Sequence, residues 1–383
     1  MEILIVLLLT GIMWRLQKAV YRHYGLRHIE YKSYLSTKEA YEGDVVELVE
    51  EISNRKALPV PWLKSEITTS RWLSFAGSQS AVTDQTRFVP SFFMLRGHQK
   101  VTRRWKVTCL RYGEHPIVKT TLVTGDLLGN VVLSKPAAIR SSITVLPRPL
   151  PLDEFALSSR HSVGELMVRR RLLPDPFLRC GVREYEEFDP LSHINWMASA
   201  KEKKWMVHRF DATAQQKLAV VLNMQTNSER AWDHVNRVVA DRGVHVCAAC
   251  FDSTLASGIP VRFLTNASTN ENKEASITCT NEAWGRTHVI QLLRVLAQLR
   301  LEVAQDFDSF LRDKVRQLEA TNLVIVTAHA EGSLLRFVQE EQERGIAVKI
   351  LLVSPPARPV SPGLEVYDVS GAFCREEDLY EKA

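Results

Sequence analysis

The sequence predicts an α+β chain of two domains, in which an apolar N-terminal helix precedes an antiparallel β-sandwich and then a doubly wound α/β domain. The 383 residues exceed the roughly 250 to 300 at which a single hydrophobic core stops growing. Short strands of alternating polarity fill the first part of the chain, whereas apolar strands alternate with helices after residue 213. The 45% hydrophobic and 24% charged residues argue against a disordered chain and against a multi-span membrane bundle.

The apolar run from Ile3 to Trp14 predicts a membrane anchor helix over residues 1–24. The run is shorter than the ~20 residues of a spanning helix, but the following residues extend it if Arg15 and Lys18 reach the interface with their charged ends. Glu2 precedes the run and no small-residue cleavage site follows it, so a secretory signal peptide is not predicted. A buried or interfacial amphipathic helix is the alternative.

The distribution of charge predicts a single-pass protein of the cell membrane with most of the chain in the cytoplasm. Arg15, Lys18, Arg22 and Arg27 all follow the apolar run, which is the arrangement of the positive-inside rule. Residues 1–216 hold 31 Lys and Arg against 22 Asp and Glu, whereas the rest of the chain holds 18 against 22. The basic part is therefore expected near an anionic membrane surface. The six scattered cysteines favour a reducing compartment.

Residues 28–148 are expected to form the β-sandwich. The segment "VTRRWKVTCL" (101–110) alternates strictly, with Val101, Trp105, Val107 and Cys109 on one face. Two further strand-like runs flank "NRKALPVP", whose asparagine and prolines end the strand pairing. The prolines of "VLPRPLPLDE" (145–154) then mark a linker, so we place the domain boundary at residue 149 and assign residues 149–212 to a linker and joint segment.

Residues 213–383 are expected to form the α/β domain, a parallel sheet covered by helices on both faces. The expected strands are "KLAVVLN", "VHVCAACF", "IPVRFLT", "NLVIVTA" and "AVKILLVSP", and the expected helices are "SERAWDHVNRVVADRG", "HVIQLLRVLAQLRLE" and "LLRFVQEEQERG". The "CAAC" in the second run could be a redox or zinc half-site. A buried strand is the preferred interpretation, because residues three apart on a strand point to opposite faces.

The loops after the strands give no catalytic or metal-binding pattern. Asn223, Gln225 and Asn227 follow the first strand, where a hard cation would require acidic or hydroxyl side chains. The loop after "NLVIV" has no carboxylate before Glu331. Neither a glycine-rich phosphate loop, nor a G-x-S-x-G turn, nor an aromatic nucleic-acid platform occurs in the sequence. We therefore predict a non-enzymatic protein with no cofactor, no metal and no nucleic-acid partner.

The stretch "REYEEFDPLSHINWMASAKEKKWMVHRF" (183–210) is the most unusual part of the sequence. Asp189 followed by Pro190 predicts the start of a short helix that runs to about Ala200. "WMVHRF" is expected to be a strand that leads antiparallel into the parallel sheet, and Arg183 and Glu184 are expected to pair with charges around Asp189. On this interpretation the stretch is a structural joint with Trp196 buried in it.

The same stretch resembles the bacterial "domain of unknown function 58" family, whose signature reads R-E-Y-x-P-G-D-x-x-R-x-I-x-W-x-x-S-A. The residues that match at the same spacing are Arg183, Glu184, Tyr185, Asp189, Ile194, Trp196, Ser199 and Ala200. Glu187 and Phe188 replace the proline and glycine, and Ser192 replaces the second arginine. "GDLLGN" (125–130) is similar to a further motif of the family, and most members carry two anchor helices where this chain has one at most.

The resemblance implies a membrane-anchored, non-enzymatic protein with a von Willebrand factor A-like domain. It also implies a MoxR-type AAA+ ATPase as partner, and sometimes a transglutaminase-like membrane protein. Metal-binding von Willebrand A domains use D-x-S-x-S after the first strand, so Asn223, Gln225 and Asn227 make the corresponding site degenerate. We therefore expect a protein-interaction or scaffold function, with the ATPase bound by residues 213–383 at the carboxyl edge of the sheet. A metal-dependent ligand-binding module with an atypical site is the alternative.

Overall fold

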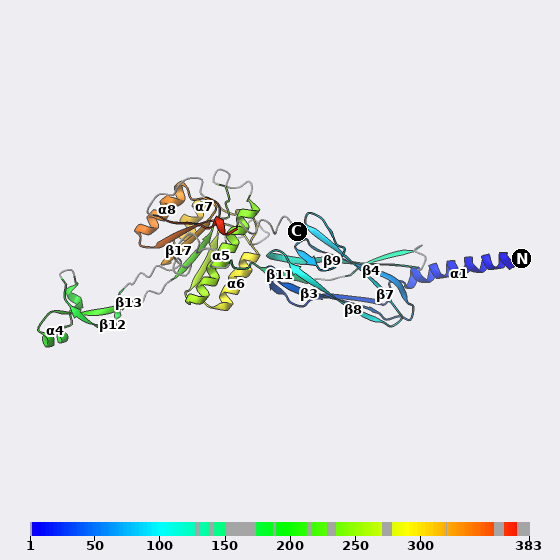
Figure 1. The fold of residues 1–383 in the computed structure, drawn as a ribbon, viewed down its shortest axis with the longest axis horizontal. Coiled ribbons are helices and arrows are strands. Elements are labelled where there is room, and N and C mark those ends of the chain that lie inside the picture. Colours follow the sequence, from blue (N-terminus) through cyan, green and yellow to red (C-terminus); the bar gives the residue numbers. More distant parts are fainter. Residues whose placement is uncertain are drawn as a thin grey trace. The chain divides into compact units, whose positions relative to one another are not determined.

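The structure, a computed structural model, is α+β with an N-terminal helix and several sheets (Figure 1). It describes residues 2–126, 131–137, 141–150, 174–186, 189–212, 217–227, 235–269, 278–318, 320–355 and 364–373. Two compact units make up the chain, namely Met1–Arg148 with Leu293–Leu299, and Pro149–Leu292 with Arg300–Ala383. Residues 127–130 of "GDLLGN" and residues 151–154 of the proline-rich linker therefore lie outside the described residues.

Helix α1 (Glu2–Tyr24) exposes large apolar side chains around its whole circumference. These are Ile3, Ile5, Leu7, Leu8, Leu9, Ile12, Met13, Trp14 and Leu16. Successive helical residues are about 100° apart, so these positions leave no polar face along the first four turns. Among the helices that the structure describes, none combines the length and the apolarity that a membrane span requires.

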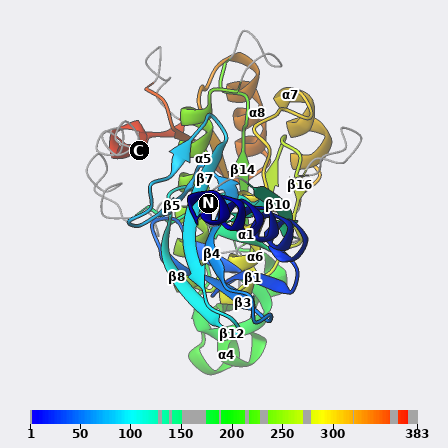
Figure 2. The ribbon, with the colours of Figure 1, turned by 90° about the vertical axis from the view of Figure 1, so that its right-hand side faces the viewer.

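The carboxyl end of α1 is packed against the sandwich. Tyr21 is buried, and its hydroxyl donates a hydrogen bond to the Pro59 carbonyl oxygen at 3.3 Å. A Cβ atom at Gly25 would lie 2.6 Å from the Tyr21 carbonyl oxygen and 2.8 Å from Leu133 Cδ1. Only glycine therefore permits this approach of the helix end to Leu133, which lies on the strand beside it (Figures 1 and 2).

Two sheets form the first unit. The four-stranded sheet has the order β1-β3-β8-β5 and is antiparallel, with β1 (Ile29–Leu35), β3 (Val45–Asn54), β5 (Leu73–Phe75) and β8 (Lys100–Cys109). The seven-stranded sheet has the order β2-β11-β9-β4-β7-β6, with β10 paired to β9; its strands are β2 (Glu39–Tyr41), β4 (Val60–Ser70), β6 (Ala81–Val82), β7 (Thr86–Leu95), β9 (Gly113–Gly125), β10 (Val132–Ala137) and β11 (Ser141–Leu146). Its pairs are antiparallel except for β11 with β2.

Both sheets contribute side chains to a shared core, so the unit is a β-sandwich. Leu48 and Val107 come from one sheet, and Ile67 and Ile143 from the other. The alternation predicted for β8 is present, because its odd-numbered residues are the less exposed ones.

A carboxylate lies in the interior of the sandwich. Glu50 on β3 is fully buried, and four donors surround it. Its Oε1 accepts hydrogen bonds from the Tyr31 hydroxyl and Ser65 Oγ, both at 2.8 Å. Its Oε2 accepts from Ser91 Oγ at 2.9 Å and from Trp105 Nε1 at 2.6 Å. The donors come from both sheets, so this cluster joins them by hydrogen bonds as well as by apolar contact.

A separate small element contains the family-like stretch. Strand β12 (Pro174–Glu184) pairs antiparallel with β13 (Met206–Ala212) and with no other described strand. Between them lie a 3₁₀ turn, η1 (Leu191–His193), and the short helix α4 (Trp196–Glu202). We call β12, η1, α4 and β13 the signature hairpin. The expectation that 205–210 leads into the parallel sheet is thus wrong, since β13 pairs only with β12.

The second unit contains a six-stranded sheet with the order β16-β15-β14-β17-β18-β19. Its strands are β14 (Leu218–Leu222), β15 (Val261–Thr265), β16 (Thr278–Cys279), β17 (Asn322–Thr327), β18 (Ala347–Leu352) and β19 (Glu365–Asp368). All pairs are parallel except β15 with β16. If the six strands are numbered by their order in the chain, their order across the sheet is 3-2-1-4-5-6. This is a doubly wound order, with its switch point between β14 and β17.

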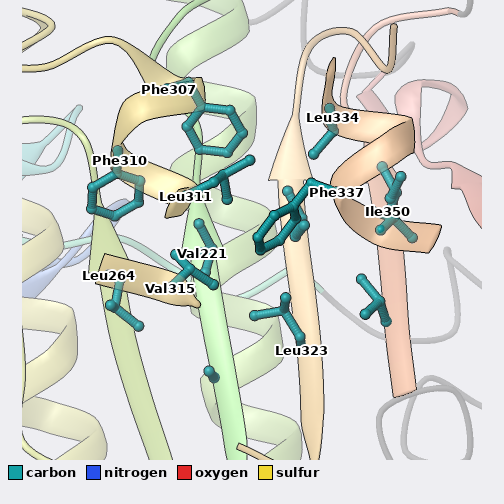
Figure 3. Close-up of a cluster of buried hydrophobic side chains, with 14 of the residues drawn as sticks. Val221, Leu264, Phe307, Phe310, Leu311, Val315, Leu323, Leu334, Phe337 and Ile350 are labelled. Carbon is teal, nitrogen blue, oxygen red and sulfur yellow. The ribbon is translucent and has the colours of Figure 1, made fainter. Parts of the chain in front are cut away.

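Helices cover both faces of this sheet. On one face, α7 (Phe307–Phe310), the π-helical turn η2 (Leu311–Val315) and α8 (Gly332–Glu343) pack on residues such as Val221 and Ile350 (Figure 3). On the other face lies α5 (Arg237–Ser257), because Gly243 of this helix packs against Leu222 and Val326. The remaining helices are α6 (Arg286–Ala297) and η3 (Ser370–Phe373).

Helix α5 corrects one expectation. "VHVCAACF" (244–251) is not a strand but the central part of α5, and the helix predicted over 228–243 begins only at Arg237. Every residue from 244 to 251 is buried, so no polar face remains to reveal the helical period. Gly243 does not end the helix; its missing Cβ would lie 2.8 Å from Leu222 Cδ1, so it allows close packing on the sheet.

Candidate functional site

Two places in the second unit were candidates for function, and the first is the carboxyl edge of the six-stranded sheet. Asn223 follows β14 directly and is 5% exposed. Its Oδ1 accepts hydrogen bonds from the Gln225 backbone N–H at 2.9 Å and from Asn266 Nδ2 at 3.5 Å. Its Nδ2 donates to Thr327 Oγ1 at 3.1 Å. The Asn223 amide therefore joins the loops after three neighbouring strands, β14, β15 and β17.

Gln225 continues this network toward α7. Its Nε2 donates to Asp306 Oδ1 at 3.3 Å, and its Oε1 accepts from the Phe307 backbone N–H at 3.3 Å. Asp306 is the N-cap of α7, since its Oδ2 accepts from the Ser309 backbone N–H at 3.2 Å. Asn227 is exposed and lies farther along the loop.

Burial favours the neutral form of the histidine at the same edge, because it lowers the pKa of the imidazole. His329 follows β17, and its carbonyl oxygen accepts a hydrogen bond from Thr327 Oγ1 at 2.9 Å. Burial lowers the pKa of the His329 imidazole, although Glu331 and Asp308 act in the opposite direction. Desolvation disfavours the imidazolium, so this side chain adds no positive charge to the edge at neutral pH.

The chemistry available at this edge is that of a hydrogen-bonded turn. The amide oxygens of Asn223 and Gln225 already accept protein donors, and Asp306 is the carboxylate that takes part. In the described chain no three His, Cys, Asp or Glu side chains gather as potential metal ligands. A cation that bound the amide oxygens of Asn223 and Gln225 would have to displace these hydrogen bonds.

The second candidate is the signature hairpin, where an ion pair fixes the turn. Arg183 Nη1 and Nη2 donate to the two carboxylate oxygens of Asp189 at 2.7 and 2.6 Å. Asp189 Oδ2 also accepts from the Glu186 backbone N–H at 2.9 Å. The hydrogen bond from Arg183 is the largest cause that lowers the pKa of Asp189. Glu184 pairs with Lys204 at 2.7 Å rather than with the group around Asp189.

The start of the helix differs from the prediction. Asn195, not Asp189, is the N-cap of α4, and its Oδ1 accepts from the Ala198 backbone N–H at 3.0 Å. Ser199 Oγ donates to the Asn195 carbonyl oxygen at 2.8 Å and accepts from the Met206 backbone N–H at 2.9 Å. The serine of the signature thus ties α4 to β13. Proline at 190 begins the 3₁₀ turn instead, and Ile194 interrupts the helix by bridging to Val207.

Trp196 is not buried, which contradicts its expected role in a structural joint. Its side chain is 70% exposed, while Ile194 and Val207 are 6% and 1% exposed. The hairpin pairs with no larger sheet in the described chain, and its seven-residue helix has no second layer to cover the indole. Between residues 181 and 208, the described large apolar side chains that are exposed are those of Val182, Leu191, Trp196, Met197 and Trp205. Tyr185 contacts Trp205 edge to face at 5.6 Å between ring centroids.

Several of these residues were not predicted from the sequence. Met197 and Trp205 were expected only as parts of a helix and a strand, and their exposure could not be read from the pattern. Asn266 and Asp306 belong to loops that are 43 and 83 residues beyond Asn223 in the chain. The signal that could have found them is their position directly after β15 and directly before a helix, where short polar side chains act as caps.

Comparisons with known proteins add little on function. No family model matches the chain, and no curated protein matches it. Solved structures match about a third of it. A CARDB domain from Pyrococcus furiosus, solved with di-metal ions, is 12% identical over 31% of this chain and 92% of its own, with a TM-score of 0.20.

Two further solved structures give similar values. A non-cellulosomal cohesin from Archaeoglobus fulgidus is 15% identical over 34% of this chain and 99% of its own, with a TM-score of 0.22. Trypsin-activated alpha-2-macroglobulin from Escherichia coli is 23% identical over 31% of this chain, with a TM-score of 0.23, and only 7% of that much longer chain is covered.

Proposed function

We propose that the protein is a membrane-attached, non-enzymatic interaction protein that docks a MoxR-type AAA+ ATPase through its signature hairpin. The observation that carries the proposal is the exposure of Leu191, Trp196, Met197 and Trp205 on one short element. Soluble proteins rarely leave several large apolar side chains uncovered together unless they bind something. Tryptophan and methionine are also enriched where proteins bind one another.

The hydrogen bonds of the hairpin support this role. The Arg183–Asp189 pair and the Ser199 bonds order the backbone on both sides of α4. A surface that is ordered before binding loses less conformational entropy when a partner docks. Arg183, Asp189 and Ser199 therefore stabilise the hairpin, whereas Trp196 is exposed to solvent.

The second unit supports the von Willebrand A-like assignment in its strand order alone. The doubly wound order places the loops after β14 and β17 at the switch point, where sheets of this kind bind their ligands. Because the amides of Asn223 and Gln225 are bonded within the protein, we favour the hairpin over this edge as the ATPase-binding surface. The hydrogen-bond network of Asn223 and Gln225 does not support the alternative function, metal-dependent ligand binding.

The exposed apolar side chains of α1 support the proposed membrane attachment. A helix that is apolar on all sides has no polar face to turn toward water, and lipid covers such a helix completely. Arg15, Lys18 and Arg22 follow on the same helix, where they can reach anionic headgroups.

The test is co-purification of the full chain, in detergent, with a MoxR-type AAA+ ATPase from the same organism. We expect Trp196→Ser with Met197→Ser to weaken binding by at least tenfold, while the free energy of unfolding changes by less than about 0.5 kcal/mol because both side chains are exposed. Trp284→Ser is the matched control, since Trp284 is 71% exposed on a different element of the same unit. Ile194→Ala, by contrast, should destabilise the hairpin by roughly 2 to 4 kcal/mol.

Two outcomes would contradict the proposal. If the double variant binds normally but deletion of residues 213–383 abolishes binding, the ATPase binds the α/β domain instead. If neither change affects binding, the partner assignment is wrong.

A further inference from the structure

An open pocket of about 690 Å³ lies where α1 meets the sandwich. The residues that line it are Arg22, His23, Leu26, Arg27, His28, Leu133, Ser134 and Lys135. Three of them are Arg or Lys, two are His, and none of these described lining residues is Asp or Glu. Several cationic donors and one hydroxyl therefore line the same pocket, and such a lining suits an anionic ligand.

The walls of the pocket are fixed relative to one another. Lys56 Nζ donates to the carbonyl oxygens of Gly25 and Arg27 at 2.9 and 3.1 Å, so it holds the last turn after α1. Gly25 packs against Leu133 at a distance that a side chain would prevent. His28 has φ of 55°, in the left-handed region, and turns the chain from α1 into β1. The basic side chains near the end of α1 and on β10 thus line one pocket, and Figure 2 shows the two backbone elements near each other.

The position of the pocket along α1 points to the kind of anion. The run of exposed aliphatic side chains ends at Leu16, and Arg22 follows six residues later, two residues before the exposed Tyr24. At 1.5 Å per residue this is about 9 Å along the helix axis. The headgroup layer of a bilayer is about 5 to 8 Å thick on each side of the hydrocarbon. If lipid covers the apolar part of α1, the pocket lies at the outer edge of the headgroup layer, where the long side chains of Arg22 and Arg27 can extend toward the lipid phosphates.

We propose that this pocket binds the phosphate group of an anionic phospholipid headgroup, with Arg22, Arg27 and Lys135 as the principal donors. The inference rests on the proposed membrane attachment of α1 and adds a headgroup preference to it. Arginine forms paired hydrogen bonds with phosphate oxygens, and lysine adds a point charge. The wide mouth suits a headgroup that remains attached to its acyl chains in the adjacent layer.

The test uses the full chain in neutral detergent micelles, titrated with dihexanoyl phosphatidylglycerol, dihexanoyl phosphatidylcholine and inorganic phosphate. Phosphatidylglycerol should bind at least tenfold more tightly than phosphatidylcholine or free phosphate. In the variant Arg22→Gln, Arg27→Gln and Lys135→Gln its affinity should fall by on the order of a hundredfold, because each basic residue contributes about 1 kcal/mol near an anionic headgroup. Unchanged thermal unfolding would show that the variant is folded.

The matched control is Lys38→Gln, Lys106→Gln and Lys119→Gln, which removes the same charge from exposed sandwich positions outside the pocket. It should change the affinity by about threefold or less, because distant charges are screened. Equal binding of the two lipids, or an equal loss in the control, would overturn the proposal. Inorganic phosphate binding as tightly as phosphatidylglycerol would overturn the lipid assignment and leave a free-phosphate site.

Flotation with neutral phosphatidylcholine vesicles tests membrane attachment separately. The pocket variant should float with these vesicles, whereas Leu8→Asp with Ile12→Asp should not. If the latter also floats, attachment through α1 is wrong, while the headgroup measurement in micelles stands on its own.

Discussion

At three separate turns of the second unit, an asparagine side chain accepts a hydrogen bond from a nearby backbone N–H. Asn195, Asn223 and Asn236 each accept, through Oδ1, a hydrogen bond from a backbone N–H two or three residues further on. A short amide side chain satisfies backbone donors where a helix or loop begins. Asn223 thus stabilises a turn directly after β14. The sequence could predict that position, but not the partners that occupy its oxygen.

This arrangement predicts the response to divalent cations. Titration calorimetry of the full chain with Mg²⁺ or Mn²⁺ should give no one-to-one isotherm at sub-millimolar affinity, because the amide oxygens are engaged and a Mg²⁺ ion loses its waters reluctantly. Asn236→Ala is the control for loss of an amide elsewhere. A sub-millimolar isotherm that disappears in Asn223→Ala but persists in Asn236→Ala would refute the prediction.

Among the elements, α5 shows where pattern reading fails. Its ends carry clear signals, since Asn236 caps its start and Gly258 adopts the left-handed conformation at its end. Its middle does not, because burial on every side removes the polar residues whose spacing distinguishes a helix from a strand. The strands β14, β15, β17 and β18 were predicted from similar apolar runs because they are short and bounded by polar loops. Length and caps were therefore better guides than periodicity for the buried elements.

The burial of α5 predicts the reactivity of its thiols. Burial raises the pKa of Cys250 to about 12 and also raises the pKa of Cys247, so neither forms the reactive thiolate at pH 8. The residue Cys279 is exposed to solvent, although partial burial of its thiol raises the pKa of this group as well. In a Cys180→Ser and Cys374→Ser background, Ellman's reagent should modify Cys279 at least on the order of a hundredfold faster than the α5 thiols.

The control for this measurement is the unfolded protein, in which all thiols should react at similar rates. Fast modification of two or more thiols in the folded Cys279→Ser variant would show that α5 is not buried as described.

At the scale of the whole chain, the two units differ in what the sequence revealed of them. The sandwich was predicted because its strands expose one face, so alternation survives in β3, β4 and β8. The signature hairpin was predicted less well. Its residues match a sequence pattern, but whether Trp196 is buried depends on whether another layer covers the hairpin, and a local pattern carries no information on that.

The orientation of the chain at a membrane is a prediction at this scale. The basic residues after the apolar part of α1 should hold the body of the protein on the cytoplasmic side. In the same Cys180→Ser and Cys374→Ser background, an impermeant maleimide should label Cys279 after cell lysis and not in intact cells. Labelling of the folded protein in intact cells would place the body outside.

The Glu50 cluster has a consequence for how the sandwich folds. Side chains on a strand alternate between faces, so a slip of β3 that puts Val49 in the place of Glu50 would leave Ser65, Ser91 and Trp105 unbonded in the interior. A slip in the other direction would put Glu51 in that place, but it would also put Ser53 in the place of the fully buried Ile52. Each unbonded buried group costs about 1 to 3 kcal/mol. Misaligned pairings of this strand are therefore much less stable than the native one, even where the apolar residues on either side would tolerate them. The buried carboxylate thus favours one alignment of the two sheets as the chain folds. Strands that are far apart in the sequence pair slowly, so misaligned pairings would otherwise compete with the native one.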